Sequence, residues 1–145
     1  MKVLILAAGY GTRLYSLAKD RPKPLLKINN RPLVNYILDR VQDMPGLNEV
    51  IVVTNEKFHE VFERWAKQQK AFGHPIRILN DGTTTPENRL GSVGDIQFSI
   101  KEAKINDDVL VVGGDNLFDY NIREYIEFAR SKSPSVSIGI YDIGN

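Results

Sequence analysis

The segment KVLILAAGYGTRL, residues 2 to 14, decides the fold of this chain and indicates the kind of ligand it handles. An apolar strand from Lys2 to Leu6 runs directly into a loop that contains Gly9 and Gly11. Glycine tolerates positive φ and carries no Cβ, so several backbone N–H groups of such a loop can point at one anion. We therefore expect a phosphate-binding loop at the end of the first strand.

Two cations accompany this loop. Arg13 lies within it and offers a planar fork of donors that suits phosphate oxygens. Lys23 follows between Pro22 and Pro24, which fix φ and bias the preceding residues to extended conformations. A lysine on such a stiff segment is held in one place, and we expect its charge to meet a transferred phosphoryl group.

Two better known glycine loops fit poorly. A dinucleotide-binding fingerprint requires Gly or Ala at its sixth position, where Leu14 stands, and no Walker sequence occurs in the chain. A Gly-x-Gly after a strand is by itself an ordinary tight turn in roughly half of cases. Arg13 and the Pro-Lys-Pro segment favour the phosphate-binding interpretation over a simple turn.

Strands and helices are predicted to alternate along the chain. Short β-branched runs predict strands buried on both faces at Val3 to Leu6, Val50 to Val53, Ile76 to Leu79, Val109 to Val112 and Val136 to Tyr141. Apolar stripes at helical spacing predict helices around Val34 to Val41, Phe58 to Phe72, Val93 to Ala103 and Ile122 to Ala129. This alternation predicts an α/β fold, a Rossmann-like open and mostly parallel sheet with helices on both faces.

Asp115 is the candidate metal ligand. It follows the fourth predicted strand in the sequence Gly-Gly-Asp-Asn, and ligands of open parallel sheets bind beyond the carboxyl ends of the strands. Mg²⁺ takes hard oxygen ligands and usually only one or two protein carboxylates beside substrate phosphates. The alternative is a turn aspartate that bonds its own backbone.

Taken together, these motifs resemble the nucleoside-diphosphate-sugar pyrophosphorylases, which are the sugar-1-phosphate nucleotidyltransferases. The resemblance rests on LAAGYGTRL at residues 6 to 14 and PKPLLKINNRPLVNYIL at residues 22 to 38. It continues in VVTN at 52 to 55, LGSVGD at 90 to 95 and GGDN at 113 to 116, and so covers essentially all 145 residues.

The resemblance implies a set of nucleotide-binding residues. They are Leu6, Ala8, Gly9, Gly11, Thr12, Arg13, Leu90 and Gly91. The first three would form one wall of the nucleobase site and Leu90-Gly91 the other, with backbone atoms reading the edge of the base. Because backbone atoms do the reading, the sequence does not identify the base.

The reaction that the resemblance implies is Mg²⁺-dependent, in-line transfer of a nucleoside monophosphate from a nucleoside triphosphate to a sugar-1-phosphate, with release of pyrophosphate. The attacking phosphate is already anionic, so alignment and charge neutralisation are what the site must supply. Arg13 and Lys23 are the catalytic candidates: Arg13 would hold the leaving pyrophosphate and Lys23 the α-phosphate. Mg²⁺ on Asp115 would bridge phosphate oxygens.

Composition restricts the other possibilities. Hydrophobic residues make up 42% of the chain and charged residues 26%, which fits one domain with one core. A formal net charge of +1 gives no reason to expect nucleic acid or an anionic membrane as partner, and the absence of cysteine excludes thiolate catalysis. The N-terminal apolar run from Val3 to Ala8 is too short for a signal peptide, so we expect a cytoplasmic protein.

Family members continue into a sugar-binding half that supplies a second metal-binding aspartate and a lysine for the sugar phosphate. We therefore expect residues 1 to 145 to be the nucleotide-binding domain, apparently lacking that half, and to turn over poorly or not at all alone. Two alternatives stay open: cytidylyl transfer to a non-sugar phosphate such as phosphocholine, and a non-catalytic nucleotide-binding regulatory module. Dimers and tetramers are common in the family, but no interface is specified by the sequence.

Overall fold

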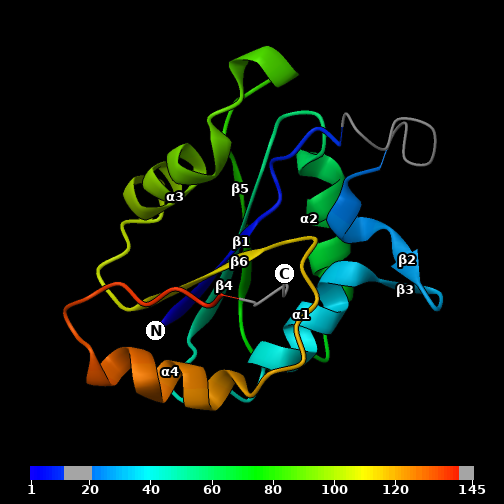
Figure 1. Ribbon diagram of the computed structural model, residues 1–145. Coiled ribbons are helices and arrows are strands. Elements are labelled where there is room, and N and C mark those ends of the chain that lie inside the picture. The colour runs from blue at the N-terminus through cyan, green and yellow to red at the C-terminus, as the bar shows by residue number, and fades with distance from the viewer. Residues whose placement is uncertain (12–20, 141–145) are drawn as a thin grey trace, which may run out of the picture.

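The computed structural model describes residues 1–11 and 21–140, and its centre is a parallel β-sheet (Figure 1). The strands are β1 (Lys2–Leu6), β4 (Glu49–Thr54), β5 (Ile76–Asn80) and β6 (Val109–Gly113), in the spatial order β5-β4-β1-β6. All three neighbouring pairs are parallel, with Leu4 of β1 opposite Ile51 of β4 and Val111 of β6. The predicted open parallel sheet is confirmed.

Helices cover both faces of this sheet. They are α1 (Leu33–Val41), α2 (His59–Gln68), α3 (Gly91–Glu102) and α4 (Ile122–Ser131). In Figure 1, α3 lies on the side of the sheet opposite α1 and α2. Successive side chains of a strand point to opposite faces of the sheet, so one strand packs against the helices on both sides. Val3 and Ile5 pack in the cluster that contains α1, α2 and α4 residues, whereas Leu4 packs in the smaller cluster with Ile96 of α3.

The order of the strands creates a switch point beside β1. From β1 the chain passes through α1 to β4 and through α2 to β5, then returns across the sheet through α3 to β6 on the other side of β1. The strand order therefore reverses between the neighbouring strands β1 and β6. Ligands of open parallel sheets bind beyond the carboxyl ends of the strands at such a position, which is where we expect a ligand.

The fifth predicted strand, Val136 to Tyr141, is wrong for the part that the structure describes. Residues 136–140 form no strand, and Tyr141 lies outside the described residues. The side chains of Val136, Ile138 and Ile140 are 88%, 78% and 92% exposed. An alternating pattern forms a strand only when a neighbouring strand pairs with it and a core covers one face, and neither is present among the described residues.

The predicted apolar stripe of α3 is also partly wrong. Val93 is 81% exposed and Ile100 is 41% exposed, while the polar residues Asp95 and Ser99 are buried. Ser99 satisfies its hydroxyl group within the helix, where Oγ donates to the carbonyl oxygen of Asp95 at 2.7 Å. The helix therefore turns a partly polar face toward the sheet, a placement that apolar periodicity alone does not reveal.

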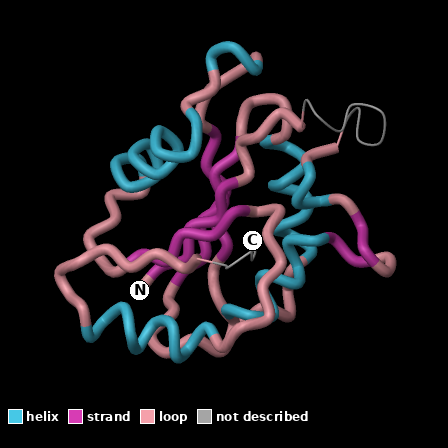
Figure 2. Tube along the Cα trace, viewed as in Figure 1, coloured by secondary structure: helices cyan, strands magenta, loops and turns pink. Residues whose placement is uncertain are grey.

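Two short elements were not predicted. A two-stranded antiparallel hairpin, β2 (Lys27–Ile28) and β3 (Arg31–Pro32), projects away from the main sheet (Figure 2). Its turn residues Asn29 and Asn30 have φ values of 49° and 64°. Asparagine is one of the few residues that accept such values, so the Asn-Asn pair was the available sequence signal.

None of the described helices is both long and apolar enough to span a membrane.

Candidate active site

Three parts of the chain meet at the switch point. They are the end of β1, the Pro-Lys-Pro motif and the residues that follow β6. The backbone N–H of Gly114 donates to the carbonyl oxygen of Leu6 at 2.8 Å. A Cβ at residue 114 would lie 2.8 Å from that same oxygen and 2.8 Å from Cγ of Pro24, closer than real Cβ atoms come. Glycine is therefore required at position 114 for the three predicted motifs to come together.

This packing brings Lys23 and Asp115 to the same edge of the sheet. The Nζ atom of Lys23 lies 3.6 Å from Oδ2 of Asp115. The two side chains are 33% and 47% exposed, so both reach solvent and a ligand could contact either of them. A pair this exposed contributes little to stability, about 0–1 kcal/mol, which points away from a purely structural role.

The lysine segment is stiff, but its conformation differs from the prediction. Residues Lys23–Leu25 form a short 3-10 helix, η2, with Pro22 as its N-cap. The backbone N–H of Leu25 donates to Pro22 at 2.9 Å, and that of Leu26 donates to Lys23 at 3.0 Å. The prediction of an extended residue before Pro24 is therefore wrong, because proline is tolerated in the first turn of a helix, where its missing N–H has no partner to lose.

The start of the glycine loop is anchored by β4. The backbone N–H of Ala7 donates to Val53 at 2.9 Å, and Nδ2 of Asn55 donates to the carbonyl oxygen of Ala8 at 2.8 Å. Asn55 is completely buried, and its Oδ1 accepts from the N–H of Phe58 at 3.2 Å. Asn55 thus positions the loop, a role that was missed even though a polar residue directly after a buried strand is a usable signal.

The two glycines of the loop behave differently. Gly11 has φ of +65°, as expected, whereas Gly9 is not among the glycines with positive φ, so the expectation fails there. No atom of residues 1–11 and 21–140 other than those of the chain neighbours lies within 4 Å of a Cβ placed at either position. Thr12 and Arg13 lie outside the described residues, and their predicted roles stay predictions.

Leu90 and Gly91 lie at the beginning of α3. Gly91 has φ of +75°, a value that favours glycine, and Leu90 is 44% exposed. A Cβ at Gly94 would lie 2.8 Å from Cβ of Leu90, so a glycine four residues after the leucine makes room for its side chain beside the first turn of the helix. The segment before it contains the short 3-10 helix η3 (Pro86–Asn88), capped by reciprocal bonds between Thr85 and Asn88.

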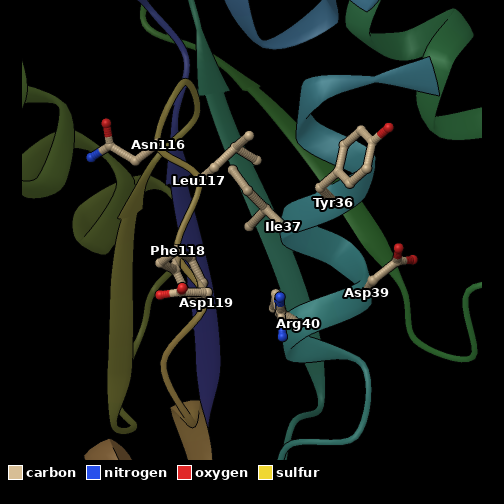
Figure 3. A pocket seen from close by; sticks show the side chains of 8 residues that line it. All are labelled: Tyr36, Ile37, Asp39, Arg40, Asn116, Leu117, Phe118 and Asp119. Carbon is tan, nitrogen blue, oxygen red and sulfur yellow. The ribbon is translucent and has the colours of Figure 1, made fainter. Parts of the chain in front are cut away.

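A cleft lies next to Asp115. Its volume is about 590 Å³, within the usual range for small-molecule sites. Figure 3 shows its two walls, formed by α1 and by the segment Asn116–Asp119 that follows Asp115 directly. Charged residues from both walls line it, among them Arg40 and Asp119. Neither Lys23 nor Asp115 lines this cleft, so it lies beside the lysine–aspartate pair and not over it.

The donors present suit a magnesium ion held jointly with substrate phosphates. Asp115 offers a half-exposed carboxylate, and no group of three or more potential metal-ligating side chains exists within residues 1–11 and 21–140. A site of one carboxylate completed by phosphate oxygens and waters is typical of Mg²⁺ and unlike a dedicated protein cage. Asp115 therefore fits the predicted role, in which the nucleotide supplies the other oxygen ligands.

A glycine loop, a lysine and an aspartate at the switch point of a parallel sheet define a nucleotide-binding α/β protein that handles phosphate groups. The chain belongs to the nucleotidyl transferase family, whose model matches residues 2–145. The family predicted from the motifs is thereby confirmed.

Curated relatives and solved structures agree with this assignment. The chain is 32% identical over 122 residues to the D-glycero-alpha-D-manno-heptose 1-phosphate guanylyltransferase of Campylobacter jejuni, covering 84% of this chain and 51% of the relative. It is 30% identical over 129 residues to the mannose-1-phosphate guanyltransferase of Pichia angusta, covering 88% of this chain and 34% of that relative. The crystal structure of HddC from Yersinia pseudotuberculosis matches 88% of this chain and 53% of its own, with a TM-score of 0.69 and 25% identity. The chain thus spans about a third to a half of the length of these proteins.

Proposed function

We propose that this chain carries the nucleotide-binding domain, residues 1–145, of an enzyme that transfers a nucleoside monophosphate from a nucleoside triphosphate to a sugar-1-phosphate. The observation that carries the proposal is the 3.6 Å approach of Lys23 to Asp115 at the switch point of the sheet. The names of the relatives, which are guanylyltransferases of hexose and heptose 1-phosphates, support the same class of acceptor. The proposal includes a cytoplasmic location, where nucleoside triphosphates are available.

The proposed chemistry needs no general base. An anionic oxygen of the sugar-1-phosphate attacks the α-phosphorus of the triphosphate in line, the bond from that phosphorus to the bridging oxygen breaks, and pyrophosphate leaves with the bonding electrons. The ammonium of Lys23 stabilises the charge on the α-phosphate, and Arg13 holds the leaving pyrophosphate. When bound at Asp115, Mg²⁺ supplies further neutralisation of the phosphate oxygens.

Backbone groups of the loop do the positioning. Among the described residues, no atom beyond the chain neighbours crowds Gly9 or Gly11, and the anchoring of Ala8 by Asn55 holds the start of the loop in place. Donors that are already in place lose little entropy when the triphosphate binds, which favours catalysis by alignment.

Release of pyrophosphate tests the proposal. The intact enzyme that carries this domain is incubated with each of the four common ribonucleoside triphosphates and dTTP, in combination with mannose-1-phosphate, glucose-1-phosphate, a heptose 1-phosphate and phosphocholine. GTP with a sugar-1-phosphate is the pair to test first, because the relatives are guanylyltransferases. Release with CTP and phosphocholine alone would replace the proposal by cytidylyl transfer to a non-sugar phosphate. Tight nucleotide binding with no release for any acceptor would favour a non-catalytic module.

A further inference from the structure

Two buried carboxylate oxygens lack a hydrogen-bond partner within residues 1–11 and 21–140. They are Oδ2 of Asp81 and Oδ1 of Asp95. Asp95 is only 7% exposed, so its carboxyl group is almost entirely removed from water. A buried, unpaired carboxylate oxygen is costly, and two in one small domain call for a physical explanation.

The two carboxyl groups approach one another across the layer between the sheet and α3. Asp81 comes directly after β5, and the two-residue period places it on the same face as Leu79, which packs in the cluster beneath α3. Asp95 lies one turn into α3 and is buried against that face. Both unpartnered oxygens therefore belong to this layer, where the charge of Asp81 acts on the carboxyl group of Asp95.

Two carboxylates that approach one another in a buried layer cannot both be ionised without strong repulsion, and a hydrogen bond between them requires a proton on one. Burial, followed by the charge of Asp81 and the hydrogen bond to it, raises the pKa of Asp95 to about 6. A shared proton gives both unpaired oxygens a partner. It therefore accounts for all of the unsatisfied buried side-chain oxygens within residues 1–11 and 21–140.

The second oxygen of Asp81 connects this pair to the glycine loop. Oδ1 accepts from the backbone N–H and from the hydroxyl of Thr83, each at 2.7 Å. The same hydroxyl oxygen accepts from the phenol of Tyr10 at 3.1 Å. A continuous chain of hydrogen bonds thus runs from Asp81 through Thr83 to Tyr10, which stands between Gly9 and Gly11.

We propose that Asp81 and Asp95 share one proton and that the pair positions the glycine loop and residues 82–94 for nucleotide binding. The nucleotide part rests on the proposed function, whereas the shared proton does not. Asp81 and Asp95 are positioning residues, because they act on the ligand through Thr83 and Tyr10.

Within residues 1–11 and 21–140, the side chains that line the sheet face beside the pair provide no counter-ion. The strand residues that face α3 beside the pair are apolar, namely Leu4, Leu6, Ile51, Val53 and Leu79. The charged side chains on these strands lie at the opposite end of the face and pair with one another, with Glu49 contacting Lys2 at 2.7 Å and Arg77 at 2.8 Å. The charged residues of the connecting loop and of α3 are exposed: Glu87, Arg89, Lys101 and Glu102.

The shared proton makes the position of the loop depend on pH. Below about pH 6 the proton joins the two carboxyl groups. Above it the proton is lost, two buried like charges face each other, and the connection between α3 and Thr83 loosens. Nucleotide binding is then expected to weaken relative to a variant in which the pair cannot ionise fully.

Titration of the aspartate carboxyl carbons by ¹³C NMR tests the shared proton in the absence of any nucleotide. Asp95 should titrate near pH 6 in the wild-type protein and at lower pH in Asp81→Asn, which removes the facing charge but retains the burial. Glu102→Gln, an exposed change on the same helix, should leave the midpoint unaltered. An Asp95 midpoint near 4 in the wild type, or one that Asp81→Asn does not move, would overturn the pair.

Two measurements test whether the pair positions the loop. The first is hydrogen exchange of the Thr83 amide, and the second is the affinity for GTP. At pH 8 the Thr83 amide should exchange several-fold faster in the wild type than in Asp95→Asn, and the difference should vanish at pH 5. GTP should correspondingly bind Asp95→Asn three- to ten-fold more tightly than the wild type at pH 8 only. Equal Thr83 exchange at pH 8 would overturn the positioning role. If the amide behaves as expected but neither protein binds GTP or another triphosphate, the proposed function fails and the pair stands.

Discussion

The ammonium nitrogen of Lys23 lies 3.6 Å from Oδ2 of Asp115, although the two residues belong to segments that follow different strands. Gly114 makes this approach possible, because its lack of a side chain lets the end of β6 contact both Leu6 and Pro24. The lysine that we propose for the α-phosphate and the carboxylate that we propose for the metal are therefore neighbours.

Replacement of Lys23 by alanine should lower the rate of pyrophosphate release by about 10²-fold or more, because an electrostatic contact to the α-phosphate is lost. Stability should change by less than about 1 kcal/mol, since the pair with Asp115 is exposed. The measurements are pyrophosphate release at saturating triphosphate and urea denaturation. Lys27→Ala, which removes an exposed lysine of the neighbouring hairpin, is the matched control and should retain activity. Full activity of Lys23→Ala would remove it from the mechanism.

Asp115→Asn should weaken the response of the enzyme to Mg²⁺, because an amide oxygen is a poorer ligand than a carboxylate for a hard cation. We expect a severe loss of pyrophosphate release, with partial recovery at high Mg²⁺ concentration. Chelation of divalent cations should abolish the reaction of the wild type. Asp43→Asn, at another exposed loop position, serves as control. An unchanged Mg²⁺ dependence in Asp115→Asn would show that the metal is held elsewhere.

Gly114→Ala should destabilise the fold and lower activity together. The new Cβ would lie 2.8 Å from the carbonyl oxygen of Leu6 and from Pro24, so the end of β6 must shift, at a cost of roughly 1–3 kcal/mol. Chemical denaturation measures the first effect and pyrophosphate release the second. Gly73→Ala adds the same methyl group where nothing lies within 4 Å, and it should be close to neutral. Equal stabilities of the two variants would contradict the close approach.

Asn55→Ala should cost about 1–3 kcal/mol of unfolding free energy, because it takes the amide donor from the buried carbonyl of Ala8 and removes one of the two acceptors of the Phe58 N–H. It should also raise the apparent dissociation constant for the triphosphate, since the start of the glycine loop loses its anchor. Calorimetric binding and urea denaturation check both effects. Asn106→Ala, at an exposed position, should alter neither quantity. Wild-type nucleotide affinity in Asn55→Ala would mean that the loop does not depend on this anchor.

Asp95→Asn should change the pH dependence of stability. The pKa of Asp95 is raised to about 6 in the folded chain, so the folded state binds more protons than the unfolded state between about pH 4 and 6. The stabilisation is therefore fully present below about pH 4 and is lost as pH rises through 6. Relative to the wild type, Asp95→Asn should gain roughly 1–3 kcal/mol between pH 4 and pH 8. Denaturation curves at both pH values measure this, and parallel profiles would contradict it.

Strands were predicted well where they are buried on both faces, because such strands consist of continuous β-branched residues. In β4, for example, every residue is buried. The same local signal failed at residues 136–140, because β-structure also requires a partner strand that local sequence does not reveal. Apolar spacing likewise located α3 but not its orientation. The helix turns Asp95 toward the sheet, and apolar spacing gives no signal for a buried polar residue.

The residues of the candidate site also fall into those that local sequence indicated and those that it did not. Gly11, Lys23 and Asp115 were found because each lies in a short motif whose chemistry is local: a turn that needs positive φ, a cation between prolines and a carboxylate after a strand. Asn55 was not assigned a role, since what it does depends on a backbone carbonyl in another segment.

The sequence by itself determined the class of sheet and the position of the glycine loop after β1, because strand burial and loop conformation are encoded by neighbouring residues. The tertiary structure alone decided that β6 returns beside β1, so that Gly114 packs on Leu6 and Asp115 approaches Lys23. It also decided that Asp81 and Asp95 meet beneath α3. These contacts depend on strand order and on how α3 packs against the sheet, and both are set by the packing of the whole core rather than by any one segment.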